Sequence, residues 1–177
     1  MLVQLAMRQV IKIQTISIDI LSNSYDLFIL ANTVLLPGIA LLSTFTVNVA
    51  CTSYIRIAWL YTAQSTNQTI SIATYNVPAS TQIDDVSIID TTTSQQLLTN
   101  AGFENGTNGW SGAAVGNIGS NGGSCNSGSW CYSDGSTSPH GSIAQSISTT
   151  VGRTLSVSFY IKWSGSGTIY NLITITP

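Results

Sequence analysis

Apolar and polar residues alternate with a period of two along most of this chain. Residues 9–21 carry isoleucines at every second position, with one slip at Gln14 and Thr15 that resembles a bulge. Similar patterns, rich in β-branched and aromatic residues, return at 41–49, 54–61, 69–74, 81–89, 142–148, 154–163 and 168–176. A period of two with such residues is typical of strands that bury one face. No stretch has a helical period, so we expect an all-β protein.

The strand predicted over residues 9–21 is followed by no hairpin turn. A strand this long and apolar would be an aggregation hazard at a sheet edge, so it must be buried in this chain or in another. The side chains expected to be buried are Ile11, Ile13, Ile16, Ile18 and Ile20.

The composition changes past the middle of the chain. Residues 91–96 are a polar stretch, and every glycine except Gly38 lies at or beyond Gly102. We expect residues 113–138, which are rich in Gly, Ser and Asn, to form long loops around one or two short strands. The predicted organisation is an extended N-terminal segment (1–35), a first module (36–90), a linker (91–96) and a second module (97–177).

The two halves also align with each other. Residues 42–50 match 144–152, and the alternating apolar residues of 55–61 match those of 157–163. Any two pairs of β-strands can align by chance, but the loops that follow both pairs match as well and favour a repeat.

The second half resembles a known family. The residues that carry the resemblance are Leu-Leu-Thr-Asn-Ala-Gly-Phe-Glu at 97–104 with Gly109-Trp110, and the strands at 143–155 and 156–162. They are similar to the galactose-binding-like jelly rolls of carbohydrate-binding modules in xylanases and cellulases, and to repeats of secreted surface proteins. Such modules close with a strand like Ile-Asp-Asp-Val-Ser-Ile at 83–88. The resemblance therefore implies two jelly-roll-like β-sandwich modules, each incomplete, because the first has no opening and the second stops before its closing strand.

A missing strand leaves unpaired backbone and an exposed core. If residues 9–21 filled the gap of a neighbouring copy, copies would join head to tail into a filament by strand donation. The alternative is that the strand completes its own first module and gives a two-domain monomer. Two further readings are a carbohydrate-binding or adhesive module of a larger secreted protein and an accessory module of a glycoside hydrolase.

Charge is scarce in this chain. Asp, Glu, Lys and Arg make up 7% of the residues, against ~25% in ordinary proteins. Five Lys and Arg are too few for a nucleic-acid patch. Glu104 and His140 are the sole Glu and His, no catalytic motif is present, and consecutive Asp84 and Asp85 should point to opposite faces of a strand. An enzyme is not expected.

Cysteines and sequons favour an extracellular or cell-surface protein. Cys125 and Cys131 lie in a Gly/Ser-rich loop without a histidine, which suits a disulfide better than a zinc site, and Cys51 is left as a free thiol. Asn67 and Asn105 begin N-x-T sequons for glycosylation. Residues 1–10 lack the apolar core of a signal peptide, so export is unconventional or the N-terminus is processed or lies upstream. No membrane span is expected, because polar residues, Pro and Gly interrupt the apolar run at 27–42.

Two binding sites are predicted. The resemblance implies a structural calcium ion held by Glu104 with Asp84 or Asp85, although turn capping and loop hydrogen bonds are the alternative roles for these carboxylates. Glycans would bind at Trp130 and Tyr132, with Asp134 close by. The alternative for Trp130 is packing over the disulfide. Three other tryptophans are expected to face the core: Trp59, Trp110 and Trp163.

Overall fold

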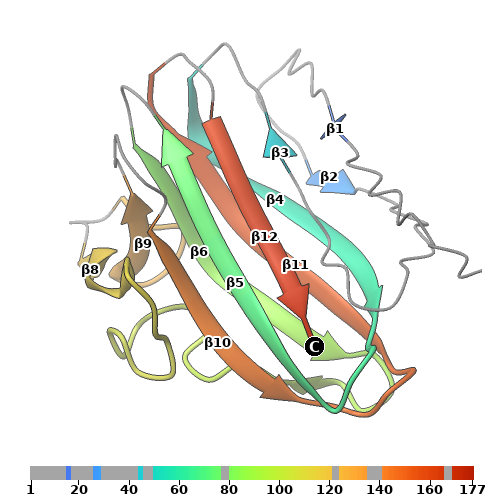
Figure 1. The fold of residues 1–177 in the computed structure, drawn as a ribbon. Coiled ribbons are helices and arrows are strands. Elements are labelled where there is room, and N and C mark those ends of the chain that lie inside the picture. Colours follow the sequence, from blue (N-terminus) through green and yellow to red (C-terminus); the bar gives the residue numbers. More distant parts are fainter. Residues whose placement is uncertain are drawn as a thin grey trace, which may run out of the picture.

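The computed structural model describes residues 15–16, 26–28, 44–45, 50–76, 80–120, 124–134, 141–165 and 169–177. Over these residues the chain is all-β, as the alternation predicts, and the one helical turn described is η1 (Val115–Asn117). The strands form two antiparallel sheets that face each other, with parallel pairing only at the short N-terminal strands (Figure 1).

The smaller sheet has three strands, in the order β10 (Ser142–Ser148), β5 (Asn67–Asn76) and β12 (Ile169–Thr176). The larger sheet runs β2 (Asp26–Phe28), β4 (Cys51–Thr62), β11 (Thr154–Trp163), β6 (Thr81–Asp90), β9 (Trp130–Asp134) and β8 (Ile118–Ser120), and β7 (Gln95–Gln96) adds to β6. A separate parallel pair joins β1 (Thr15–Ile16) to β3 (Thr44–Phe45).

Alternate side chains of both sheets point into one core. Ile72 of β5 and Ile173 of β12 belong to the same buried cluster as Val157 and Phe159 of β11. Trp59, Trp110 and Trp163 are buried, as expected. The predicted strands 142–148 and 154–163 are confirmed with their bounds, because their alternation matches one buried face over the whole strand.

The division into two modules is corrected by the strand pairing. β11 of the second half lies between β4 and β6 of the first half, and β5 lies between β10 and β12. Described strands from both halves therefore share the same sheets and the same core. The apparent repeat has a physical reason: β4 and β11 are antiparallel neighbours, with Ile57 opposite Phe159, and both present one face to one core.

The predicted closing strand, residues 83–88, lies within β6 and pairs with β11. β11 therefore has a strand partner on each side, β4 and β6, both from the first half of the chain. The predicted linker is also structural: Asp90 accepts hydrogen bonds from the backbone N–H groups of Thr92 and Thr93, and β7 folds back onto the end of β6. Residues 91–96 are therefore a tight turn.

Candidate functional site

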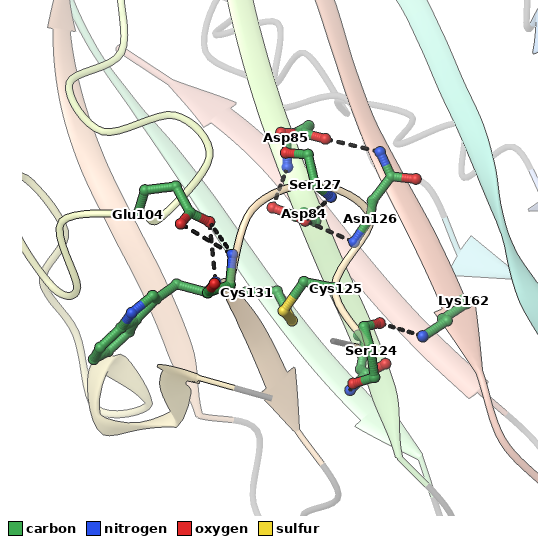
Figure 2. Close-up of a disulfide and its surroundings, with 12 residues drawn as sticks. Asp84, Asp85, Glu104, Ser124, Cys125, Asn126, Ser127, Cys131 and Lys162 are labelled. Carbon is green, nitrogen blue, oxygen red and sulfur yellow. Dashed lines mark hydrogen bonds between the residues drawn. A yellow bond between two sulfur atoms is a disulfide. The ribbon is translucent and has the colours of Figure 1, made fainter. Parts of the chain in front are cut away.

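The predicted carboxylates meet at a bulge in β6. β11 pairs with β6 through Ser158 and Ser87, and then through Tyr160 and Asp84, so β6 has one extra residue between these pairs. Asp85 lies in this bulge with a left-handed φ of 47°. The bulge turns both aspartates toward the disulfide loop (Figure 2). The expectation that they point to opposite faces is wrong, because it assumes an unbroken strand.

Asp84 is fully buried beneath the disulfide loop. Its Oδ2 accepts hydrogen bonds from the backbone N–H of Asn126 at 2.8 Å and of Ser127 at 3.0 Å, and its Oδ1 accepts one from the Asp85 N–H at 2.7 Å. Burial raises the pKa of Asp84 to about 6, and the negative charge of Asp85 adds to this, although the three N–H donors act in the opposite direction.

Asp85 and Glu104 hold the exposed part of the same loop. Asp85 accepts hydrogen bonds from the Ser127 hydroxyl at 2.7 Å and from the Asn126 side-chain amide at 2.8 Å. Glu104 accepts from the backbone N–H groups of Ser129 and Trp130 at 3.0 Å. Gly128 has a φ of 55°, and a Cβ there would overlap the Glu104 carboxylate, so this position requires glycine.

The disulfide predicted between Cys125 and Cys131 is present, with 5.6 Å between the two Cα atoms (Figure 2). It closes the loop that the three carboxylates bind, Asp84 and Glu104 through backbone N–H groups and Asp85 through two side chains. Residues 125–131 are called the clamped loop below.

A shared calcium ion does not fit these residues. The carboxylate oxygens of Asp84 and Glu104 face N–H donors, which a cation would have to displace, and the two side chains bind different parts of the clamped loop. Among the described residues, no group of three or more His, Cys, Asp and Glu is placed to hold a metal ion. The contacts match the alternative roles: Glu104 caps a turn, and Asp85 hydrogen-bonds within a loop.

The predicted sugar platform lies largely inside the protein. Tyr132 and Asp134 are buried, at 0% and 2% exposure. The Tyr132 hydroxyl donates to Asp134 Oδ2 at 3.3 Å, Thr74 donates to the same oxygen at 3.2 Å, and burial raises the pKa of Tyr132. Trp130 is partly buried and packs against the core. Two of the three predicted residues are therefore out of reach of a glycan.

Lys162 joins the residue that precedes the clamped loop to the larger sheet. Its Nζ donates to the Ser124 carbonyl and lies 4.5 Å from the centre of the Tyr54 ring, and partial burial lowers its pKa. Sequence reasoning missed this contact, because it joins β4, β11 and a loop that are distant along the chain and no local pattern marks it.

Residues 97–114 cover the outer edge of β10. Ser111 and Ala144 exchange two backbone hydrogen bonds, at 2.9 and 2.7 Å. The buried side chain of Gln145 pairs with the backbone of Thr99, accepting from its N–H at 2.6 Å and donating to its carbonyl at 2.9 Å. Asn100 organises the turn, because its amide group bonds the backbone at Asn105, Gly106 and Asn108. The Gly-Phe-Glu motif identified this loop, but it did not predict that the loop covers the edge of β10.

Both sequon asparagines are exposed. Asn67 begins β5 and Asn105 lies in the turn of residues 100–110. Cys51 is a free, partly buried thiol at the start of β4, and burial raises its pKa.

The opposite side of the molecule ends in two long strands. β4 and β12 are the outer long strands of the two sheets, and we call them the open side (Figure 1). Within the described residues, β4 is extended only by β2, which pairs with Arg56, Ile57 and Ala58, and β12 hydrogen-bonds only to β5. β3 lies alongside β12, and β1 pairs with β3. β1 holds Ile16 of the predicted donor strand, while Ile11, Ile13, Ile18 and Ile20 lie outside the described residues.

The chain matches no family model, no curated protein and no solved structure. Within the part of the chain that the structure describes, no helix is long and apolar enough to cross a membrane.

Proposed function

We propose that this protein is a non-catalytic structural protomer of an extracellular filament or surface matrix, whose copies join head to tail by exchange of N-terminal β-strands. The observation that carries the proposal is the open side. The outermost long strands of the two sheets, β4 and β12, lie there, and their outer neighbours among the described residues are the short N-terminal strands β2 and β3. Unpaired strand edges are templates for pairing with another chain.

Exchange between copies would repeat pairings that the chain makes with itself. β2 on β4, and β1 with β3 near β12, show that residues before Ala50 reach the open side of their own chain. The same contacts made with a neighbour cost little extra free energy, as in domain swapping. Because the N-terminal segment and the open side are different surfaces, the contact is heterologous, and it builds a filament when the rotation between copies does not close a ring.

The composition supports cohesion by backbone pairing and apolar burial. The formal net charge is −2, so there is little electrostatic repulsion between copies. The disulfide is compatible with an oxidising, extracellular setting. We further propose that the exposed Asn67 and Asn105 carry glycans, which intact-mass and peptide mass spectrometry of the native protein would detect.

Negative-stain electron microscopy of the purified full chain tests the proposal. We expect filaments that persist in high salt, because apolar and backbone contacts are only weakly screened. Replacing Ile13, Ile16 and Ile18 with lysine should abolish them. The matched control replaces Lys12, Ser17 and Asp19, which lie between the isoleucines, with alanine and should leave filaments intact. A monomeric full chain, or filaments unaffected by the lysine substitutions, would contradict strand exchange.

The alternative of a carbohydrate-binding or adhesive module has less support. Its predicted site needs exposed aromatic and polar groups, whereas Tyr132 and Asp134 are buried.

A further inference from the structure

We propose that the acceptor for the exchanged strand is the outer edge of β12, and that its occupant is the segment 9–21 of a second copy. This inference rests on the proposed strand exchange and adds which of the two open edges receives the strand. β12 and β4 differ in charge, regularity and the neighbours that their own chain provides.

β12 itself carries no charge, proline or bulge that would protect it as an edge strand, although β3 lies alongside it. It pairs with β5 in continuous register from Ile169 to Thr176, without a bulge. Its sequence, Ile-Tyr-Asn-Leu-Ile-Thr-Ile-Thr, contains no charge and no proline before Pro177. Natural edge strands are commonly blunted by lysine, proline, bulges or short length. An uncharged, regular edge of this length is well suited to pairing with another strand.

The inner face of β12 also favours an apolar partner. Ile173 and Ile175 are each 1% exposed and belong to the core. A strand added beside β12 would place alternate side chains at the border of that core, as neighbouring strands share one pleated face. The isoleucine alternation of residues 9–21 provides such a row of side chains, with polar residues between them.

β4 is a poorer acceptor. Its register with β11 shifts near its beginning, between the Ile161 and Trp163 pairs, so the strand is irregular there. Arg56 places a charge on the strand, and β2 pairs with it in register so that Asp26 lies opposite Arg56. The chain's own β2 therefore already occupies part of this edge.

The two described residues of the donor segment pair with a strand that lies alongside β12 in the same chain. Thr15 and Ile16 form β1, which pairs with Thr44 and Phe45 of β3, and β3 lies alongside β12. β3 is not hydrogen-bonded to β12, so the backbone groups on the outer edge of β12 have no strand partner among the described residues. A donated strand would provide those hydrogen bonds.

Site-specific cross-linking between two full-length chains tests this assignment. Both chains carry Cys51→Ala to remove the free thiol. One chain carries Ser17→Cys in the donor segment, and the other, fused to a tag of different mass, carries Thr174→Cys on β12. Matched acceptors are Thr62→Cys on β4 and Ser146→Cys on β10, the sealed edge of the same small sheet. The proposal does not fix the register of the donated strand against β12. Donor chains with Lys12→Cys and Asp19→Cys are therefore tested in parallel. The chains are mixed, allowed to polymerise and mildly oxidised, and mixed-mass dimers are read on a non-reducing gel.

We expect the Thr174→Cys acceptor to give at least tenfold more mixed-mass dimer than Ser146→Cys with at least one donor. Filaments that cross-link through Thr62→Cys and not Thr174→Cys would overturn the assignment to β12 but leave strand exchange standing. Filaments with no cross-link at any acceptor would also overturn it. A failure of the proposed function is distinct, because the wild-type chain would then form no filaments.

Discussion

The closed side and the open side of this protein end their sheets in opposite ways. On the closed side, residues 97–114 cover β10 through the Ser111–Ala144 pair and the Gln145 side chain, and the larger sheet tapers to the three-residue β8. On the open side, the two outer strands are long, with β4 running over 12 residues and β12 over 8, and their described neighbours are N-terminal strands of two or three residues.

This difference between the two sides suggests that the closed side contributes to the stability of the fold and the open side to association between copies. The polar side chains of the closed side form hydrogen bonds within the chain. Phe103 and Trp110 of its loop are part of the core. The open side presents the outer edges of two long strands, of which β12 is regular and would gain most from a partner. Mutations on the closed side should therefore change the free energy of unfolding, whereas mutations on the open side should change the oligomeric state.

The largest expected effect is at Phe103. Its ring is fully buried and lies 5.1 Å from the Trp110 ring, centre to centre. Phe103→Ala should lower the free energy of unfolding by about 3–5 kcal/mol, because it leaves a cavity where the loop packs on the core. The control is Leu60→Ala on β4, where the side chain is 58% exposed and the change should stay within about 0.5 kcal/mol. Denaturant unfolding measures both free energies. Equal losses in the two variants would contradict the view that the closed side carries more of the stability than the open side.

The clamped loop should make stability depend on pH through Asp84. Its pKa is about 6 in the folded protein against an ordinary value of 3.8. The stabilisation from its protonation is fully present below pH 3.8 and is lost as pH rises through 6. The loss should be roughly 2–3 kcal/mol. The side chain of Asp84→Asn does not titrate. The unfolding free energy of wild type should therefore fall relative to that of the variant as pH rises from 4 to 7. A pH-independent difference would show that Asp84 titrates normally.

Gln145 should have an intermediate effect. Gln145→Ala leaves the N–H and carbonyl of Thr99 without their partner, which should cost about 1–3 kcal/mol. The neighbouring Ser146 is exposed, so Ser146→Ala should have little effect. Hydrogen exchange at Thr99 provides a local measure, and unchanged protection there would mean that other contacts seal β10.

The smallest effect on stability is expected at the open edge. Thr174→Lys puts a charge on β12 at a partly exposed position and should change the unfolding free energy by less than about 0.5 kcal/mol. It should nevertheless shorten or abolish filaments, since lysine on an edge strand opposes pairing with another chain. Ser146→Lys on β10 is the matched control. Filaments of normal length with Thr174→Lys would contradict the assignment to β12 and favour β4 as the acceptor.

Strands were predictable from this sequence because their signal is local. The alternation of residues 142–148 and 154–163 marks one buried face, and those bounds are confirmed. Strand partners were not predictable, because any strand with the same alternation fits the same core. The similarity between 55–61 and 157–163 therefore suggests a repeat of modules in the sequence, although it arises from two neighbouring strands of one sheet.

The sequence predicted which residues gather at the site, but not what those residues do there. Asp84, Asp85 and Glu104 do gather around one loop, and Cys125 and Cys131 do pair. Their role could not be derived, because the bulge at Asp85 and the amides that meet the carboxylates depend on tertiary pairing. The two motifs at 83–88 and 97–104 do meet, since Val86 donates a backbone hydrogen bond to the Ala101 carbonyl.

The position of β11 between β4 and β6 also sets an order for biosynthesis. β4, β5 and β6 leave the ribosome long before β11. Their apolar faces therefore stay partly uncovered until β11, which begins at Thr154, has been synthesised. The smaller sheet is completed last of all, by β12 at the carboxyl end. During that interval, neighbouring nascent chains could pair wrongly, so correct production of this protein depends on the late strands arriving before the early ones meet another chain.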